Sequence, residues 1–283
     1  MEIIVARNSG FCFGVKRAVN LAFDAVKVHK KDIYSLGPII HNPQVVEALA
    51  KEGVGQVNSI DKVKEGSLIL RSHGISSPEI LDDARSRGLN IIDATCPFVK
   101  KAQQYARRLV EEGYKVILVG DEQHPEVKSI IGHAGGDCIV GEDYDSIRDR
   151  IKGKKIGILA QTTQDYSIFS DIIVKCLKDA EEVKIFNTIC DATGLRQEEA
   201  VELARKVDLM LVIGGRNSAN TTRLATICRE TGRDVRLIET EEEIDDAWFK
   251  NIGRVGITAG ASTPIWLIEG VVDRLKKIKN QEV

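Results

Sequence analysis

The stretch Asp93–Phe98, DATCPF, places Cys96 directly before a proline and shortly after the apolar run Asn90-Ile-Ile. Proline is favoured in the first turn of a helix, because its missing N–H would have no intrahelical partner there. We therefore expect Cys96 to stand where a strand ends and a helix begins. The following helix is expected to be amphipathic, because apolar residues recur at helical spacing at Val99, Ala102, Ala106, Leu109 and Val110.

The pattern around Cys96 occurs three times in the chain. Strand, cysteine and helix follow one another in EIIVARNSGFCFGVKRAV around Cys12, in NIIDATCPFVKKAQQYA around Cys96 and in KIFNTICDATGLRQEEA around Cys190. A repeat within one chain indicates repeated structural units. We therefore expect the three cysteines to occupy equivalent places.

Two polar strand tips follow each of these cysteines. The first tip comes 28 or 29 residues later and carries His41, His124 or Ser218. The second comes 61, 66 or 72 residues later, with SHG at His73, QTT at Thr162 and GAST at Ser262. Ligands of open parallel sheets bind at the carboxyl ends of strands. Each repeat is therefore expected to direct its cysteine and its polar tips toward the same kind of edge.

Apolar runs such as SLILRSHG, KVILVGDEQH and LMLVIGGRNS alternate with helix-period stretches along the chain. This alternation predicts an α/β fold of three pseudo-repeated units with small, mostly parallel sheets. The units are expected at residues 14–95, 96–189 and 190–283, the last completed by residues 1–13. The first strand is assigned to the C-terminal unit because the other two cysteine-preceding strands close the unit before them.

Five of the six prolines stand between an apolar strand and a helical stretch: Pro43, Pro78, Pro97, Pro125 and Pro264. Helix N-termini present unpaired N–H groups and the positive end of the helix dipole, which suit anions. Several such termini at one edge would therefore favour an anionic ligand.

The composition excludes several classes of protein. Apolar residues make up 43% and charged residues 29% of the chain, as in soluble globular proteins, and the net charge is −2. The sequence lacks a basic cluster interleaved with aromatics, an apolar run long enough for a membrane span and a recognisable secretory signal. We expect a cytoplasmic protein that binds neither nucleic acid nor membrane. Six cysteines are also too few for a disulfide scaffold.

Three converging thiolates suit either zinc or an iron–sulfur cluster. Zinc sites usually show short CxxC pairs, whereas these cysteines are 84 and 94 residues apart. On a four-iron cluster, three cysteines leave one iron without a protein thiolate and open to substrate. The other cysteines, Cys138, Cys176 and Cys228, have no equivalents in the repeat and are expected to be core residues.

The polar tips carry mostly neutral donors that suit a phosphate or diphosphate, although a single histidine there is also consistent with helix capping. Glu126, in EQHPEV, is the one carboxylate of these motifs within a first helical turn. It is either a proton donor or a glutamate that complements the helix dipole. Since the chain has no P-loop and no GxGxxG, a bound nucleotide is not predicted.

The motifs together resemble those of the LytB/IspH family of 4-hydroxy-3-methylbut-2-enyl diphosphate reductases. The resemblance covers essentially the whole chain, through SGFCFGVKRA, IIHNPQVV, SHG, DATCPFV, GDEQHPEV, LAQTTQ, TICDATGLRQEEA, GGRNSANTTRL and TAGAST. It implies a trefoil of three α/β units around one [4Fe-4S] cluster held by Cys12, Cys96 and Cys190. The implied diphosphate site comprises His41, His73, His124, Thr162, Ser218, Ala219, Asn220 and Ser262.

The resemblance also implies a reaction, the last step of the methylerythritol phosphate route to isoprenoids. Glu126, with Thr162 and His124, would relay protons while the allylic hydroxyl of the diphosphate substrate is removed reductively. The products would be isopentenyl and dimethylallyl diphosphate, and a ferredoxin- or flavodoxin-like protein would supply electrons. Ala219 departs from the family pattern, which usually has a second serine there, so we expect at most weaker phosphate binding.

Two other classes of function remain open on the residues alone. A hydro-lyase can also use a three-cysteine cluster, and it would be active without a reductant. A redox-sensing binding module would need a basic face or an effector domain, and the sequence shows neither.

Overall fold

The strand that precedes each repeated cysteine is the edge strand of a four-stranded parallel sheet. The computed structural model describes residues 1–29 and 32–281, and these residues form three such sheets. Read from the cysteine-preceding strand inward, the orders are β1-β12-β10-β11, β5-β4-β2-β3 and β9-β8-β6-β7. The order is the same each time, which confirms the α/β class and the threefold repeat of small parallel sheets.

By its internal packing the chain divides into two compact units. The terminal unit comprises Met1–Lys16, His41–Glu47 and Asp191–Val283, and the central unit comprises Arg17–Ile40 and Ala48–Cys190. The central unit contains two of the three sheets. The finer division at residues 14–95, 96–189 and 190–283 with 1–13 stays a prediction, and its residues 30–31 and 282–283 lie outside the described part of the chain.

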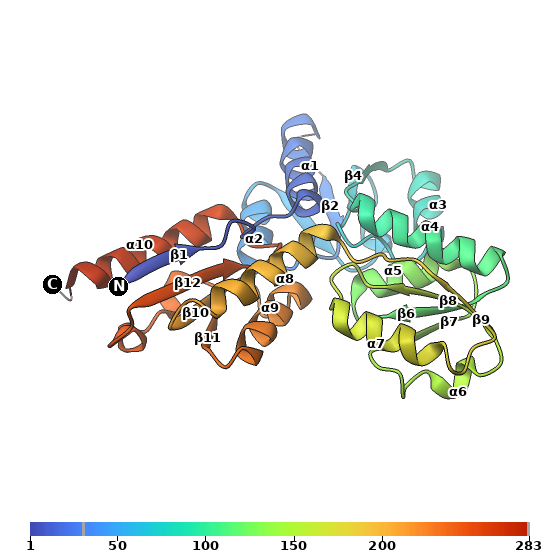
Figure 1. Ribbon diagram of the computed structural model, residues 1–283. Helices are drawn as coiled ribbons and strands as arrows, with labels where there is room; N and C mark the ends of the chain where they lie inside the picture. The colour runs from blue at the N-terminus through green and yellow to red at the C-terminus, as the bar shows by residue number, and fades with distance from the viewer. Residues whose placement is uncertain (30–31, 282–283) are drawn as a thin grey trace. The chain divides into compact units, whose positions relative to one another are not determined.

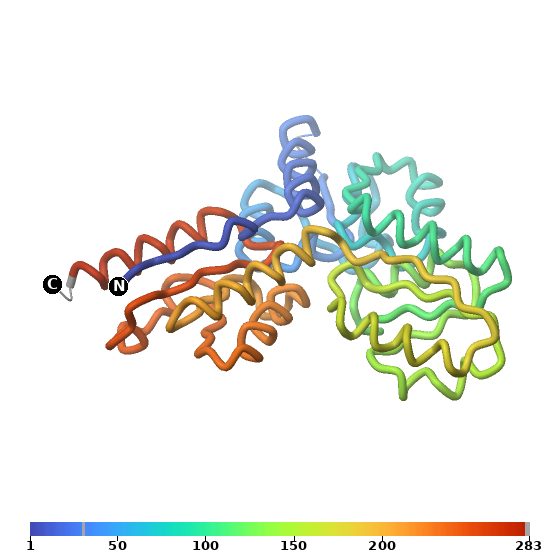
Figure 2. The backbone as a smooth tube through the Cα atoms, viewed as in Figure 1, coloured from blue at the N-terminus to red at the C-terminus, as the bar shows by residue number. Residues whose placement is uncertain are grey.

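The sheet of the terminal unit joins the two ends of the chain. It contains β1 (Glu2–Val5), β12 (Arg254–Ala259), β10 (Leu209–Ile213) and β11 (Asp234–Ile238). The first strand runs beside the late strand β12, with Glu2 opposite Arg254 (Figures 1 and 2). This pairing confirms that the first strand joins the C-terminal sheet. The helices of this unit are α8 (Asp191–Ala204), α9 (Ala219–Glu230) and α10 (Ile265–Gln281).

The two sheets of the central unit follow the same plan. One contains β2 (Ile33–Leu36), β3 (Val54–Val57), β4 (Ser67–Leu70) and β5 (Asn90–Asp93), and the other contains β6 (Lys115–Val119), β7 (Cys138–Gly141), β8 (Lys155–Ala160) and β9 (Glu182–Ile185). The helices of this unit are α3 (Glu79–Ser86), α4 (Pro97–Glu111), α5 (Pro125–Ala134), α6 (Arg148–Ile151) and α7 (Tyr166–Cys176). Two helices, α1 (Phe13–His29) and α2 (Pro43–Lys51), begin in the terminal unit and end in the central one.

Parallel strands covered by helices on both faces bury side chains on both faces. Along β10, Leu209, Leu211 and Ile213 enter one buried cluster, while Met210 and Val212 enter another. The predicted amphipathic helix is α4, whose Val99, Ala102, Ala106 and Leu109 are buried while Val110 is partly buried. Alternate strand residues are therefore buried on opposite faces of each sheet, which holds the sheet between its helices. The polar residues that follow the strands lie at the carboxyl edges of the sheets.

The prolines stand where the sequence predicts. Pro43, Pro97 and Pro125 begin α2, α4 and α5. Pro78 is the N-cap of α3, and Pro264 directly precedes α10. Within residues 1–29 and 32–281, none of the helices has the length and apolar content that a membrane span needs.

Candidate functional site

Each repeated cysteine is held by a backbone hydrogen bond to the polar tip of the neighbouring strand. The N–H of Cys12 donates to the carbonyl of Ala261 at 3.1 Å, that of Cys96 to Ser72 at 2.9 Å and that of Cys190 to Thr162 at 2.9 Å. The acceptors lie in the GAST, SHG and QTT motifs, which confirms that the repeat is structural. Each cysteine is half-buried and stands directly before a helix, namely α1, α4 or α8.

Arginines and a glutamate orient the loops that lead to two of these cysteines. In the terminal unit, buried Arg196 donates to the carbonyls of Asn8 and Gly10, at 2.8 and 2.9 Å. Glu199 accepts from the N–H groups of Arg7 and Asn8. In the central unit, Arg17 donates to the carbonyls of Asp93 and Thr95, just before Cys96. Charged side chains thus fix the backbone that presents the thiols.

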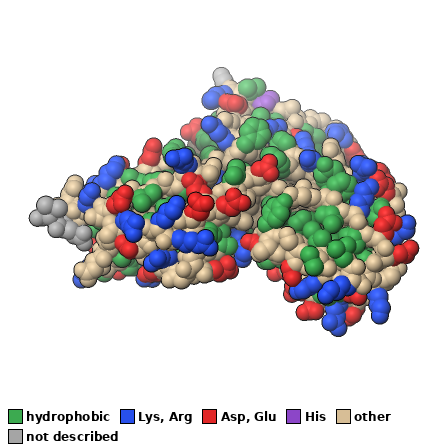
Figure 3. Space-filling view, in the orientation of Figure 1, with side chains coloured by type: hydrophobic (Ala, Val, Ile, Leu, Met, Phe, Trp, Pro, Cys, Tyr) green, Lys and Arg blue, Asp and Glu red, His purple; other side chains and the backbone are tan. Residues whose placement is uncertain are grey.

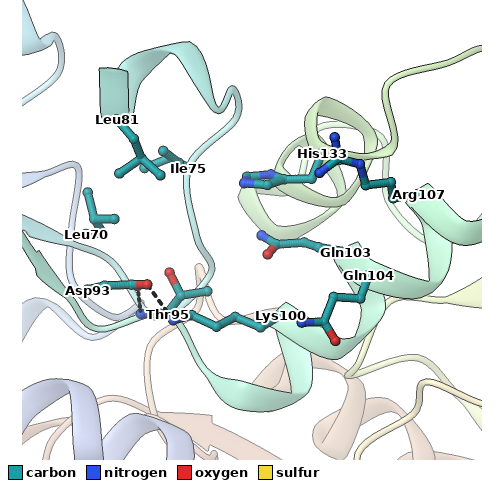
Figure 4. A pocket seen from close by; sticks show the side chains of 10 residues that line it. All are labelled: Leu70, Ile75, Leu81, Asp93, Thr95, Lys100, Gln103, Gln104, Arg107 and His133. Carbon is teal, nitrogen blue, oxygen red and sulfur yellow. Dashed lines mark hydrogen bonds and ion pairs between the residues drawn. The ribbon is translucent and has the colours of Figure 1, made fainter. Parts of the chain in front are cut away.

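The loop before Cys96 also carries an ion pair. Asp93 accepts from the N–H of Thr95 at 2.9 Å and pairs with Lys100 of α4 at 2.5 Å (Figure 4). Burial alone would raise the pKa of Asp93, but the hydrogen bonds from Lys100 and Thr95 outweigh it and lower that pKa. The carboxylate is therefore ionised at neutral pH and holds the turn in place.

Glu126 is the buried carboxylate of the central unit. Only 2% of its surface is exposed, and it accepts from the Thr162 N–H at 2.6 Å and from the Thr162 hydroxyl at 2.9 Å. Burial raises the pKa of Glu126, and the two hydrogen bonds from Thr162 only partly oppose this. Such a carboxyl retains its proton to a higher pH than an exposed one, which suits an acid catalyst.

Two histidines are connected to the helix turn that carries Glu126. His124 is the N-cap of α5, and its Nδ1 accepts from the N–H of Glu126 at 3.2 Å. In neutral His124 the proton is therefore on Nε2. The rings of His124 and His73 meet edge to face, with 5.3 Å between centroids. The structure thus brings four predicted site residues together in the central unit: Glu126, Thr162, His124 and His73.

Three segments of the terminal unit meet in a second group of polar residues. The Ser262 hydroxyl donates to the carbonyl of His41 at 3.1 Å and lies 3.5 Å from the hydroxyl of Ser218. Ser218 is the N-cap of α9, with Ala219 as the first residue of that helix. The side chains of Ser218, Ser262 and Asn220 are each more than nine-tenths buried. Predicted site residues from three distant motifs are therefore adjacent in this unit.

Asn220 has no hydrogen-bond partner, within the described part of the chain, for either its amide nitrogen or its amide oxygen. The amide nitrogen of nearly buried Asn42 is also unpaired there, although its oxygen caps α2 by accepting from Val45. Leaving a buried polar group unpaired costs about 1–3 kcal/mol. Such a cost is consistent with residues placed to bind a polar ligand rather than to stabilise the fold.

Of the other three cysteines, Cys176 and Cys228 are buried in hydrophobic clusters, as the sequence predicts, whereas Cys138 is half-buried and packs against one. Cys138 lies in β7, Cys176 in α7 and Cys228 in α9. Burial raises the pKa of Cys176 and of Cys228 to about 11. These two thiols stay protonated at neutral pH and are poor metal ligands.

Comparison with known proteins places the whole chain in one family. The sequence model of the family described as LytB protein matches residues 3–276 of the chain. The chain belongs to the LytB family. Among curated relatives, it is 52% identical over 279 residues to the 4-hydroxy-3-methylbut-2-enyl diphosphate reductase of Geobacter metallireducens, covering 98% of both chains. It is 50% identical to the enzyme of the same name from Pelobacter propionicus, covering 99% of this chain and 100% of the relative.

Two solved structures of LytB relatives are similar over nearly the full length. One, described as (E)-4-hydroxy-3-methyl-but-2-enyl diphosphate reductase, the terminal enzyme of the non-mevalonate pathway, is 46% identical with a TM-score of 0.74, and the match covers 98% of this chain and 100% of that one. The other, the E-1-hydroxy-2-methyl-but-2-enyl-4-diphosphate reductase of Plasmodium falciparum, is 30% identical with a TM-score of 0.92. That match covers 97% of this chain and 88% of that one.

The loop-holding residues of this LytB protein were not identified from sequence. Arg17 lies five residues after Cys12, and Arg196 lies six after Cys190. A basic residue at nearly the same offset after two repeated cysteines was a usable signal. It is weak because arginine is common on exposed helix faces, and the pairing becomes visible only when the helix is placed against the loop.

Proposed function

We propose that the chain is a 4-hydroxy-3-methylbut-2-enyl diphosphate reductase that works in the cytoplasm. The observation that carries the proposal is the full-length likeness, at 52% identity, to a protein of that name. In the proposed reaction the allylic C–O bond breaks, a C–H bond forms, and two electrons and two protons are taken up while water leaves. The products are isopentenyl and dimethylallyl diphosphate, which completes the non-mevalonate pathway.

The diphosphate is proposed to bind His41, His73, His124, Thr162, Ser218, Ala219, Asn220 and Ser262. Support comes from the unpaired amide of Asn220, since its N–H₂ is a donor that a phosphate oxygen would satisfy. Ser218 and Ser262 offer hydroxyl donors beside it. Ala219 contributes no side-chain donor, but it lies at the N-terminus of α9, where N–H groups face anions.

Cys12, Cys96 and Cys190 are proposed to hold one [4Fe-4S] cluster. They fit such a group because each is half-buried and stands directly before a helix, at the equivalent place in its repeat. When bound, the cluster supplies electrons and one iron without a protein thiolate as a Lewis acid. The equivalence of the three backbone hydrogen bonds is the second support, because equivalent anchors present equivalent ligands.

Glu126 is proposed to supply the proton on which loss of hydroxide depends. Its raised pKa keeps the carboxyl protonated to a higher pH, while the two donors of Thr162 fix its orientation. The Nδ1 of His124 accepts a hydrogen bond from the backbone N–H of Glu126. The Nε2 of His124 therefore points away from the first turn of α5. Buried placement excludes competing water from this proton donor.

A ferredoxin- or flavodoxin-like protein is proposed as the electron donor. The central unit offers a suitable surface, because Phe98, two residues after Cys96, is exposed on α4. On the same helix face Tyr105 stacks on Phe186 at 4.1 Å, with Lys101 and Arg108 over these rings. Figure 3 shows further hydrophobic side chains gathered on the face of the central unit where α7 and β9 lie, below α4. An aromatic surface with basic neighbours suits a small acidic electron carrier.

The proposed reaction is tested with protein purified without oxygen. The substrate should be consumed with reduced methyl viologen as artificial donor, and mass spectrometry should detect both isomeric diphosphates. Failure to consume substrate with a fully reduced donor would overturn the proposal. Conversion without any reductant would indicate a hydro-lyase instead.

A further inference from the structure

A pocket separate from the groups described above lies at the carboxyl end of the first sheet of the central unit. Its volume is about 310 Å³. It is lined by residues that follow β2, β3 and β4, together with the start of α3: Leu36, Gly37, Pro38, Asn58, Ser59, Ile60, Arg71, Ile75, Ser76 and Ile80. The carboxyl ends of parallel strands are the usual position of ligands in α/β sheets.

Arg71 brings a positive charge into this pocket. Its Nε donates to the carbonyl of Gly74 at 3.0 Å, which uses one of the five N–H donors of the guanidinium. The guanidinium lies against Gly37, because a Cβ built at Gly37 would be 2.9 Å from Nη1 of Arg71. Gly37 has a φ of +76°, a conformation that also favours glycine. The backbone at Gly37 therefore leaves room for this side chain.

The charge of Arg71 is not compensated by a carboxylate among residues 1–29 and 32–281. Burial lowers the pKa of Arg71, with no acidic group acting on it. Ser59 donates to Asp61 at 2.9 Å, but that carboxylate is paired with Arg87, also at 2.9 Å. A partly desolvated cation without a counter-ion is costly unless a ligand supplies the charge.

A neighbouring pocket shows the contrasting arrangement. It has a volume of about 240 Å³, shares Ile75 and is drawn in Figure 4. There the cation Lys100 is already paired with Asp93, at 2.5 Å. The two pockets thus differ in whether the protein itself supplies the anion.

We propose that the pocket at Arg71 binds a small organic anion, a carboxylate or phosphate monoester with a short hydrocarbon chain. The planar fork of a guanidinium matches the oxygens of a carboxylate or phosphate. Leu36, Ile60 and Ile80 supply the apolar wall that a hydrocarbon chain needs. Ser76 and Asn58, both exposed at the pocket, leave the head group accessible from solvent.

An occupant would act on the turn that carries His73. Arg71 and Gly74 close this turn by two hydrogen bonds, the second from the Gly74 N–H to the Arg71 carbonyl at 3.0 Å. A ligand anchored on the guanidinium would hold Arg71 in place, and with it the turn. The site is therefore suited to an effector rather than to a second substrate.

The direct test is a crystal of the anaerobically purified protein soaked in 5-bromopentanoate. The expected result is an anomalous bromine peak among Leu36, Ile60 and Ile80, with the carboxylate on Arg71. Calorimetric titration with the same probe should show binding at least ~10-fold weaker in Arg71→Gln, because hydrogen bonds to charged groups are lost. Arg85→Gln is the matched control, since Arg85 is exposed and paired with Asp82 on α3.

Titration with 3-methylbutyl phosphate tells a phosphate ligand from a carboxylate ligand. Asn220→Leu, measured alongside, separates this pocket from the group around Asn220. A bromine peak elsewhere, or equal affinity of wild type and Arg71→Gln, would overturn the proposal. The crystal of the wild type decides even if Arg71→Gln folds poorly. Because no turnover is measured, these outcomes are independent of the proposed reaction.

Discussion

Thr162 directs both of its hydrogen-bond donors to Glu126, its N–H to Oε1 at 2.6 Å and its hydroxyl to Oε2 at 2.9 Å. The carbonyl of the same residue accepts from the N–H of Cys190 at 2.9 Å. One residue thus connects the buried carboxylate to a repeated cysteine. The position of Glu126 therefore depends on the same strand tip that anchors Cys190.

Glu126→Gln should reduce anaerobic turnover by about 10²–10⁴, because the amide keeps the size of the side chain but cannot donate a proton as an acid. Substrate affinity and iron content should stay near those of the wild type. If Glu126 only complements the helix dipole, turnover stays nearly intact and stability falls by about 0.3–1 kcal/mol. Turnover and melting temperature measured on one preparation distinguish these two outcomes.

The raised pKa of Glu126 also predicts a pH dependence of stability. The folded state binds this proton more tightly than the unfolded state. The carboxyl's contribution to stability therefore decreases as the pH rises from 4.5, the ordinary pKa of a glutamate, through the raised pKa of the folded state. Glu126→Gln should remove that decrease. Urea unfolding of both proteins across this range measures it, and parallel pH profiles would contradict the prediction.

The fold was largely predictable because two independent periodicities agree. Apolar runs alternate with helical stretches, and Cys12, Cys96 and Cys190 recur at equivalent strand ends. Local rules then act alike in each repeat, as at Pro97, whose place at the start of α4 follows from its missing N–H. The same repeat also predicted that β1, at the start of the chain, pairs with the C-terminal sheet.

The site was only partly predictable, since some of its properties depend on tertiary contacts. Sequence identified Glu126 but left its role open between catalysis and helix complementation. Its near-complete burial and its two bonds to Thr162 appear only once the tip that follows β8 meets the first turn of α5. Arg17 and Arg196 were missed for the same reason, because their partners are backbone carbonyls, which carry no sequence signal.

Cys190→Ser should lower the iron and sulfide content of anaerobically purified protein, because a serine hydroxyl is a far poorer iron ligand than a thiolate. Cys138→Ser is the matched control, since Cys138 is also half-buried but lies within β7. Its iron content should equal that of the wild type. Equal loss of iron in both variants would remove Cys190 from the proposed ligand set.

Lys101→Glu should slow reduction by an acidic protein carrier about 10-fold at low salt, because it reverses a charge on the proposed docking face. The effect should shrink as ionic strength rises. Reduction by dithionite, which needs no docking, should be unchanged. Arg85→Glu, an equal charge change on α3, serves as control, and stopped-flow absorbance of the reduced protein gives the rates. Equal slowing in both variants would indicate a general charge effect.

Asn220→Leu should weaken binding of the diphosphate substrate without lowering the stability of the protein. The buried amide of Asn220 has no partner among the described residues, so an apolar side chain of similar size should leave the protein as stable or stabilise it by about 1 kcal/mol. Binding of the diphosphate substrate should weaken about 10-fold or more, because a donor to phosphate is lost.

Asn42→Leu provides the contrast to this variant. Asn42 also has an unpaired amide nitrogen, but its oxygen caps α2 through the N–H of Val45, at 3.0 Å. Loss of that cap should destabilise the protein by about 1 kcal/mol. Anaerobic urea unfolding and calorimetric titration of both variants give the two quantities. If Asn220→Leu loses stability and keeps its affinity, Asn220 is a structural residue and does not bind the diphosphate.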